Sequence, residues 1–326
     1  MPANLTPQFI KARNKYREAT DPAAKLAALE EMLATIPKHK GTDKMQADIK
    51  RRIAKYRDAQ SGSKKGRGTG YDHIPKDGAG QVVLVGPPNS GKSALLGALT
   101  NAKPEIAEYP FSTNIPAPGM MAFEDVMIQL IDLPPVTAEY SEGWVYSLIR
   151  AADLVLLVLD ASDPDGALAF VDEVVGLLRD RHIELVEEER ESEDERIRLA
   201  PTRVVLTKSD ASSNDEIGDL REVLPFPAIE ASATSEHGLD GLRRELFDAL
   251  RVLRIYTKLP GKKPDMEEPY TLPVGSTALD AARTVHREFV DRLKYVRVWG
   301  SGRFDGQQVP SDHRLEDGDI VEIHLK

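Results

Sequence analysis

The residues best suited to chemistry lie in one short stretch of the chain, which reads GPPNSGKS from Gly86 to Ser93. The glycines at 86 and 91 let the backbone turn so that its N–H groups point inward. Lys92 then brings a cation against the β and γ phosphates of a nucleotide, and Ser93 offers a hydroxyl to Mg²⁺. The simplest alternative is a glycine-rich turn that fits this spacing by chance, and the flanking elements decide between the two.

A strand and a helix flank this stretch. The apolar, β-branched run at 81–85 is typical of a buried parallel strand, and apolar residues return at helical spacing at 94–99. Since a phosphate loop needs a strand before it and a helix after it, this context favours a nucleotide site over a chance match. The expected phosphate contacts are Gly86, Pro87, Pro88, Asn89, Ser90, Gly91, Lys92, Ser93 and Ala94.

Two residues further along are predicted to act on the metal and the γ-phosphate. Thr113 lies in the segment YPFSTNIPAPG, where a hydroxyl can reach Mg²⁺ and couple the order of the loop to the γ-phosphate. Asp132 ends the apolar run VMIQLID, where a carboxylate holds the metal through water. The predicted metal ligands are therefore Ser93, Thr113 and Asp132, and the predicted catalytic residues are Lys92 and Thr113.

The sequence also predicts which base is bound. After the apolar run RVVL, the Asp210 carboxylate can accept both the N1–H and the 2-amino group of guanine, a donor pair that adenine lacks. The Lys208 stem can cover the ring, and a Ser-Ala-Thr segment after the next predicted strand can offer N–H groups to guanine O6. An ATP site is the weaker alternative. The predicted base contacts are Thr207, Lys208, Asp210, Ser232, Ala233 and Thr234.

The composition excludes several classes of protein. The chain of 326 residues contains no cysteine, which rules out disulfides, thiolate zinc sites and cysteine nucleophiles and fits a reducing compartment. No apolar run reaches membrane-spanning length, and the N-terminal residues lack the apolar core of a secretory signal. We therefore expect a cytoplasmic protein of two or three domains that does not enter a membrane.

Charge is unevenly distributed along the chain, whose net charge is −10. Residues 1–69 carry 16 Lys and Arg against 7 Asp and Glu, so the remainder is strongly acidic. This can indicate a polyanion partner for the N-terminal part, but a solvated helical face is the simpler explanation. The run at 184–195, with eight acidic residues and one basic residue, is interpreted as a solvated loop or helix extension, with a partner-binding hook as the alternative.

Two predicted regions carry and precede the nucleotide site. Residues 1–70 contain two amphipathic helices, at 22–36 and from residue 42 onwards, which form a helical hairpin followed by a flexible basic linker. Residues 71–253 alternate strands with helices, which predicts an α/β domain with a mostly parallel, doubly wound sheet. Its strands are expected at 81–85, 126–131, 154–159, 203–206 and 228–230.

Residues 254–326 are predicted to form a compact α+β unit. One helix is expected from a cap at Ser276 or Thr277 through Phe289. This order is compatible with a small β-grasp sheet wrapped on one helix. The expected strands lie at 255–257, 270–273, 295–299 and 320–325.

The motifs GPPNSGKS, YPFST, DLPP, TKSD and SAT, in this order, resemble those of the Obg-related GTPases, in particular the developmentally regulated GTP-binding (DRG) family. The stretch from RIYTKLPGKKPD to DGDIVEI resembles the TGS domain of that family, and IPKHKGTDKMQADIKRRIAK resembles its segment before the GTPase domain. The resemblance implies a Mg²⁺-dependent P-loop GTPase that binds GTP and GDP and is associated with ribosomes. It also implies that the TGS domain docks on a translation-linked RNA or protein.

The chain departs from the family in two places. The small domain that the family inserts after its Asp-x-Pro-Gly motif has no room here, because residues 140–150 lead directly to the LVLLVL strand. Pro135 replaces the family glycine whose N–H donates to the γ-phosphate, and proline has no N–H. Val136 follows where Ras-like enzymes have a glutamine that orients water, although the family shares a hydrophobic residue there. We therefore expect slow hydrolysis and weak discrimination between GTP and GDP, with a non-cycling guanine-nucleotide-binding scaffold as the alternative.

Overall fold

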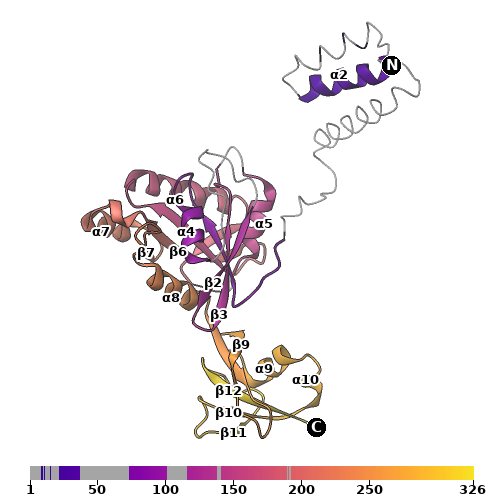
Figure 1. The fold of residues 1–326 in the computed structure, drawn as a ribbon, viewed down its shortest axis with the longest axis vertical. Coiled ribbons are helices and arrows are strands. Elements are labelled where there is room, and N and C mark those ends of the chain that lie inside the picture. Colours follow the sequence, from indigo (N-terminus) through magenta and orange to yellow (C-terminus); the bar gives the residue numbers. More distant parts are fainter. Residues whose placement is uncertain are drawn as a thin grey trace. The chain divides into compact units, whose positions relative to one another are not determined.

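The computed structural model describes residues 9, 11, 15, 22–36, 73–100, 116–137, 141–188, 190 and 192–326. The chain forms two compact units, Met1–Arg67 and Gly68–Lys326 (Figure 1). Three predictions fall outside the described residues: the second helix of the N-terminal hairpin, the basic linker and Thr113.

In the first unit, α2 spans Pro22–Thr35 and confirms the first predicted helix. Pro22 stands at the first helical position, where its fixed φ suits the helix and its missing N–H is not needed. The side chains of Leu29, Met32 and Ile36 are buried at spacings of three and four, so they share one face. The helix ends before Pro37, because the residue preceding a proline disfavours the helical conformation.

A larger sheet organises the second unit (Figure 1). Its strands follow the order β2-β3-β1-β4-β6-β5, and β7 pairs with β6. All neighbouring strands are parallel except β2, which runs antiparallel to β3. The strands are β1 (Gln81–Val85), β2 (Ala117–Phe123), β3 (Val126–Asp132), β4 (Leu154–Asp160), β5 (Ile183–Val186), β6 (Arg198–Thr207) and β7 (Ala228–Glu230).

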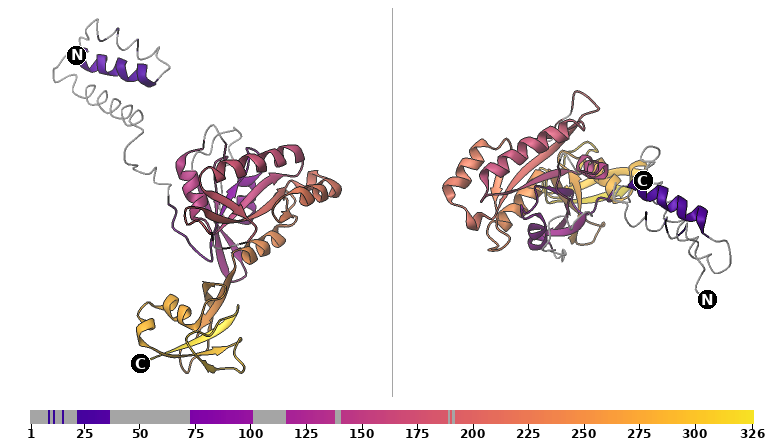
Figure 2. Two further views of the ribbon diagram at one scale, coloured as in Figure 1. Left: turned by 180° about the vertical axis from the view of Figure 1, so that it is seen from behind. Right: turned by 90° about the horizontal axis from the view of Figure 1, so that it is seen from above.

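Helices cover both faces of this sheet, as the opposite views in Figures 1 and 2 show. Val82 and Leu84 of β1 pack in one core with α4 and α8, whereas Val83 and Val85 pack in another with α5, α6 and α7. A sheet that is covered twice requires such continuous apolar strands, and the predicted α/β class with a doubly wound sheet is confirmed. The helices are α4 (Lys92–Leu99), α5 (Gly143–Ala151), α6 (Pro164–Arg179), α7 (Asn214–Val223) and α8 (Leu239–Ala249).

Three strands of this sheet differ from the predictions. The edge strand β2 was not predicted, and β6 begins five residues earlier than expected because Leu199 and Ala200 are buried. The interpretation of residues 184–195 as a loop or helix extension is wrong for their first part, which belongs to β5. The buried side chains of Ile183 and Val186 and the pairing with β6 favour a strand there, while the acidic residues follow it.

The C-terminal part forms a second, five-stranded sheet in the order β11-β10-β12-β8-β9. Neighbouring strands are antiparallel except β8 and β12, which are parallel. Val296, Val298 and Val321 share one core with Ala278 and Ala281 of α9, so the sheet wraps on one helix as predicted. Its elements are β8 (Val252–Thr257), β9 (Asp265–Pro273), α9 (Ala278–Val285), α10 (Phe289–Arg292), β10 (Leu293–Trp299), β11 (Gln307–Val309) and β12 (Asp319–Leu325).

The helix of this second domain begins as predicted but ends early. Thr277 caps α9, since its hydroxyl accepts a bond from the Asp280 N–H and the Asp280 carboxylate accepts one from the Thr277 N–H. The predicted continuation through Phe289 is wrong. The helix stops after the β-branched Val285, His286 is extended, and α10 forms a separate turn. No helix within the part of the chain that the structure describes is long and apolar enough to cross a membrane.

Candidate nucleotide-binding site

The loop between β1 and α4 has backbone conformations that require glycine or tolerate few other residue types. Gly91 precedes α4 at a φ of 89°, in the left-handed region that glycine adopts without strain, and Asn89 is also left-handed at 63°. A Cβ atom on Gly86 would lie 2.3 Å from the Val158 carbonyl oxygen of β4. Since real Cβ atoms do not approach an oxygen so closely, position 86 requires glycine, as the motif predicts.

Lys92 is the first residue of α4, and its buried side chain reaches back to the start of this loop. Its Nζ donates to the carbonyl oxygens of Gly86 and Pro87, each at 2.8 Å. Burial lowers the pKa of Lys92 to about 8, against the opposing effect of the Asp132 charge. Among the described residues, the hydrogen bonds of this buried ammonium go to carbonyl oxygens, so phosphate oxygens would add the negative charge that stabilises its protonated form.

Ser93 and Asp132 provide a pair of oxygen ligands beside this lysine. The Ser93 hydroxyl donates to Asp132 Oδ2 at 2.5 Å, and Asp132 is 5% exposed at the carboxyl end of β3. Burial raises the pKa of Asp132, and its Oδ1 is buried with no hydrogen-bond partner among the described residues. Hard oxygen ligands suit Mg²⁺, and an unsatisfied buried carboxylate oxygen fits a cation there. Of the predicted metal ligands, Ser93 and Asp132 are adjacent, and Thr113 lies outside the described residues.

Thr207 positions the loop instead of facing solvent. Its buried Oγ1 lies 2.6 Å from the Ser90 carbonyl oxygen and 2.8 Å from that of Leu159, and can donate to either. This hydroxyl ties the end of β6 to both the phosphate loop and β4. The sequence grouped Thr207 with the base contacts, and the geometry gives it a supporting position behind the loop.

The next residues present a free carboxylate. Asp210 is exposed in a short 3₁₀ turn, Ser209–Ala211, and its side chain has no partner among the described residues. Lys208 is left-handed, with a φ of 55°, and its Nζ lies 2.5 Å from Asp160 Oδ2. Although burial opposes it, the hydrogen bonds from Lys208 and Ser162 hold the pKa of Asp160 below its usual value. The sequence analysis did not identify Asp160 as part of the site. The signal that could have found it is an acidic residue at the carboxyl end of the LVLLVLD strand.

The Ser-Ala-Thr segment is folded so that one N–H remains available. The Ser232 N–H donates to the His237 carbonyl at 2.9 Å, and the Thr234 N–H donates to the buried Ser232 hydroxyl at 3.2 Å. Among the described residues, the Ala233 N–H alone of these three has no acceptor. Since the segment follows β7, beside the end of β6, Ala233 is the residue best suited to donate to a base oxygen.

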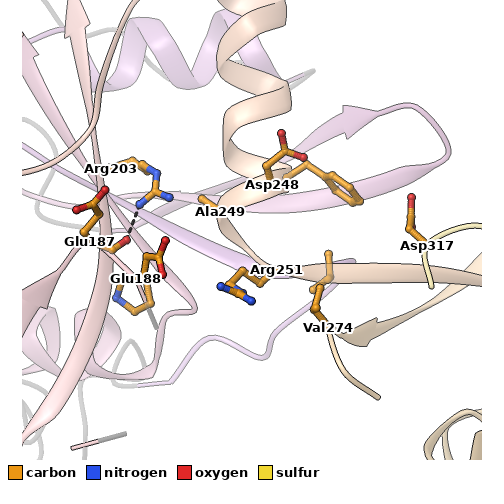
Figure 3. A pocket seen from close by; sticks show the side chains of 11 residues that line it. Glu187, Glu188, Arg203, Asp248, Ala249, Arg251, Val274 and Asp317 are labelled. Atoms are coloured by element: carbon orange, nitrogen blue, oxygen red, sulfur yellow. Dashed lines mark hydrogen bonds between the residues drawn. The ribbon is translucent and has the colours of Figure 1, made fainter. Parts of the chain in front are cut away.

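A separate cavity lies elsewhere, at the end of α8 that is remote from the Ser-Ala-Thr segment. It measures about 420 Å³ and is lined by residues of both domains, including Glu187, Arg203, Arg251 and Asp317 (Figure 3). Arg203 is already engaged, because its Nε lies 2.6 Å from Glu245 and its Nη1 donates to the Glu187 carbonyl. With acids around it and no glycine-rich loop, this cavity does not suit a nucleotide phosphate.

The β2–β3 hairpin joins the nucleotide site to the second domain. One end of β3 carries Asp132, and the turn at its other end carries Glu124 and Asp125. Arg254 of β8 bonds Glu124 at 2.5 Å, Asp125 at 2.8 Å and Asp317 at 2.7 Å. Tyr256 also donates to Asp125, and this bond raises the pKa of Tyr256 to about 12. The turn is therefore attached to the first strand of the second sheet.

Comparison with known proteins follows the same division of the chain. The family model described as "50S ribosome-binding GTPase" matches residues 81–208, and the TGS domain model matches residues 253–325. The solved YchF GTPase of Schizosaccharomyces pombe has a similar fold, with a TM-score of 0.50 and 14% identity over 78% of this chain and 100% of that one.

Three relatives match nearly the whole chain. An uncharacterized GTP-binding protein of Methanocaldococcus jannaschii is 31% identical, covering 98% of this chain and 97% of the relative. Developmentally-regulated G-protein 2 of Arabidopsis thaliana is 30% identical, covering 93% and 91%. Ribosome-interacting GTPase 1 of Saccharomyces cerevisiae is 28% identical, covering 93% and 98%. The first match extends over 381 aligned residues, so that relative contains segments with no counterpart in this chain of 326.

Proposed function

Because this chain belongs to the family of developmentally regulated GTP-binding proteins, we propose that it is a Mg²⁺-dependent guanine-nucleotide switch with slow GTP hydrolysis. The observation that supports this most is that Lys92, Ser93, Asp132 and the free Asp210 carboxylate all follow the carboxyl ends of strands in one parallel sheet. Ligands of open α/β sheets bind at these ends, where loops from several strands converge.

Each part of the nucleotide has a proposed partner. The loop 86–94 holds the phosphates, with Lys92 on the β and γ phosphates and Thr207 behind the loop. Ser93, Asp132 and Thr113 would hold Mg²⁺, which would supply positive charge against the phosphates. Asp210 accepts the guanine donors, Lys208 covers the ring while Asp160 holds its ammonium, and the Ala233 N–H reaches O6, with Ser232 and Thr234 shaping that turn.

The partner is proposed from the relatives and from the division of the chain. One relative is named for interaction with the ribosome and one matching model for binding the 50S subunit. We propose that the helical region 1–70 and the TGS domain, residues 254–326, dock this chain on a ribosome or another translation-linked RNA or protein in the cytoplasm, while residues 71–253 bind the nucleotide.

The segment after Asp132 supports slow hydrolysis. Leu133 and Val136 are buried in the core of the larger domain, with 2% and 0% exposure, and two prolines with fixed φ lie between them. Pro135 cannot donate to a γ-phosphate. The Val136 side chain is packed in the core, so it cannot orient an attacking water. A stiff segment with no N–H at position 135 favours similar affinities for GTP and GDP.

Single-turnover GTP hydrolysis with Mg²⁺, measured with and without ribosomes, tests this proposal. We expect slow hydrolysis by the wild-type chain, and the Pro135→Gly variant should hydrolyse about tenfold faster if its restored N–H reaches the γ-phosphate. Pro134→Gly is the matched control, because it loosens the same segment without restoring that donor. Hydrolysis that is already fast in the wild-type chain would contradict the role given to Pro135.

A non-cycling scaffold is the second candidate, and Pro135 is the observation that favours it. In that case GTP would bind but would not turn over, with or without ribosomes. ATP binding is tested by competition, since excess ATP should leave labelled GTP bound if Asp210 selects guanine.

A further inference from the structure

We infer that the TGS sheet binds single-stranded RNA on the face opposite α9, through a strip of aromatic and basic residues on β10 and β12. This inference rests on the proposed docking role and names its surface and its partner. The strip consists of Tyr295, Arg297, His324 and Lys326, together with Lys294, which lies at a register shift of β10 with its ammonium near the Tyr295 ring.

The pleat of β10 divides its side chains between two faces. Val296 and Val298 are buried in the core with α9, so Tyr295 and Arg297 project from the other face. The register places Tyr295 directly opposite His324 of β12. Arg297 is exposed and Tyr295 is half-buried, so both are accessible to a ligand.

Two rings of the strip are already stacked. The centroids of Tyr295 and His324 lie 4.4 Å apart with 22° between the ring planes. On the side of β11, Tyr295 borders a cavity of about 380 Å³ whose other walls include Lys294, Gln308 and Ser311. No residue of β12 lines this cavity, so it lies on the side of Tyr295 away from His324. A base inserted there would extend the stack, and Gln308 and Ser311 offer polar groups to its edge.

The cations of the strip are free to meet phosphates. Lys294 Nζ and the Arg297 guanidinium carbon each lie 5.9 Å from the Tyr295 ring centroid. Lys326 lies at the same end of the sheet, where its N–H donates to the Arg292 carbonyl. None of these cations is ion-paired with an acid among the residues that the structure describes. The register places Glu322 opposite Arg297 on the same face, but this carboxylate is buried and is paired with Lys258 and His324.

This combination favours a single strand over other polyanions. A duplex hides the faces of its bases, so it could use the cations but not the ring and the cavity. An acidic peptide could likewise pair with the cations, but it has no planar group to stack on Tyr295. Stacking and phosphate contacts together are the pattern of single-strand binding, and an RNA 2′-hydroxyl adds a group that Gln308 or Ser311 can bond.

Fluorescence anisotropy of a labelled oligouridylate of about twelve nucleotides, titrated with the full chain in GDP, tests the strip. Tyr295→Ala should raise the Kd roughly fivefold or more, and Tyr295→Phe, which keeps the ring, should bind within about twofold of the wild type. Replacing both Lys294 and Arg297 by alanine should weaken binding and reduce the slope of log Kd against log salt concentration by about 0.7 for each phosphate that is no longer neutralised. Lys263→Ala, an exposed cation outside the strip, is the matched control.

Several results would overturn the strip. These are absence of oligonucleotide binding by the wild-type chain, equal affinity for a duplex RNA of the same length, and wild-type affinity in the Tyr295 and double variants. Ribosome co-sedimentation and GDP affinity, measured on the same variants, separate this inference from the proposed function. If the variants bind the oligonucleotide as the wild type does and still co-sediment with ribosomes, the strip is not the RNA-binding surface, and the docking role is unaffected. A wild-type chain that never co-sediments with ribosomes overturns the docking role.

Discussion

The two sheets of the second unit place their functional groups in different positions. The larger sheet is covered by helices on both faces, so its strands are apolar throughout, and its polar residues gather in loops at the carboxyl ends of β1, β3, β4, β6 and β7. The TGS sheet packs α9 on one face only, and its other face carries Tyr295, Arg297 and His324 along the strands themselves. How a sheet is covered therefore determines whether its loops or its strands can bind a ligand.

The cations of the two regions differ in the same way. Lys92 is buried against backbone carbonyls and has a lowered pKa, so it requires one anion in one place. Lys294 and Arg297 are exposed beside an aromatic ring and can follow a flexible chain of phosphates. We therefore expect the first region to be specific and the second to be tolerant of sequence and sensitive to salt.

The largest expected effect separates the two regions. Among the described residues, Lys92 is the one buried cation at the phosphate loop. Lys92→Ala should therefore raise the Kd for GTP roughly a hundredfold, because hydrogen bonds between charged groups and phosphates are strong. Oligouridylate affinity should stay within about twofold. Both are measured by titration on the same preparation, and a parallel loss of RNA binding would contradict the separation.

A smaller effect concerns pH. Free Lys92, with a pKa of about 8, loses its proton as pH rises through 8, whereas bound phosphates keep it charged. Nucleotide binding above pH 8 must therefore take up a proton, and GTP affinity should fall, by at most about tenfold per pH unit. Lys92→Arg is the control, because arginine stays charged over this pH range, so any change of its GTP affinity with pH comes from the titration of the nucleotide itself. Equal slopes for the two proteins would contradict the assignment.

The same group affects the free protein in the opposite direction. Unfolded Lys92 titrates near its ordinary value of 10.5 and the folded one near 8, so between these values the unfolded chain binds more protons. The contribution of Lys92 to the free energy of unfolding should therefore rise with pH across this window, which thermal unfolding of the wild type and Lys92→Arg can compare.

The smallest effect tests whether the hairpin couples the two regions. Arg254→Ala leaves Glu124, Asp125 and Asp317 without their shared guanidinium. It should lower the free energy of unfolding by about 1 kcal/mol, a small effect because these carboxylates are partly exposed and solvent weakens the ion pairs. Nucleotide affinity should change less than twofold. Arg244→Ala is the control, since its guanidinium lies 3.8 Å from Glu124 and is mostly exposed. A tenfold change in GTP affinity would mean that the two regions communicate through β3.

The sequence predicts the nucleotide site better than its surroundings because the motif residues interact locally. The geometry of Gly86, Lys92 and Ser93 depends on one strand, one loop and one helix, and Asp132 needs only its own strand. Asp160 and the supporting position of Thr207 depend on contacts between β4 and β6, which lie far apart in the chain. Such contacts leave no local spacing to recognise.

The same reasoning explains the errors in the fold. β5 was not predicted because acidic residues lie in and after it. Its pairing partner β6 begins only at residue 198, so the pairing of Ile183 and Val186 with that strand leaves no local pattern. The helix predicted through Phe289 ends at Val285, since His286 is extended and α10 forms a separate turn, a break that the apolar spacing does not record. The RNA strip is likewise invisible in sequence, since Tyr295 and His324 become neighbours only through the register of β10 and β12.

The most direct test of the account is the ratio of the GTP and GDP dissociation constants of the wild-type chain, measured with Mg²⁺ by competition against one labelled nucleotide. With no N–H at Pro135, we predict that the two constants agree within about threefold, because the donor that would favour GTP is missing. A preference for GTP of about a hundredfold would contradict the account, since Lys92 and Thr113 would then distinguish GTP from GDP without a donor at position 135.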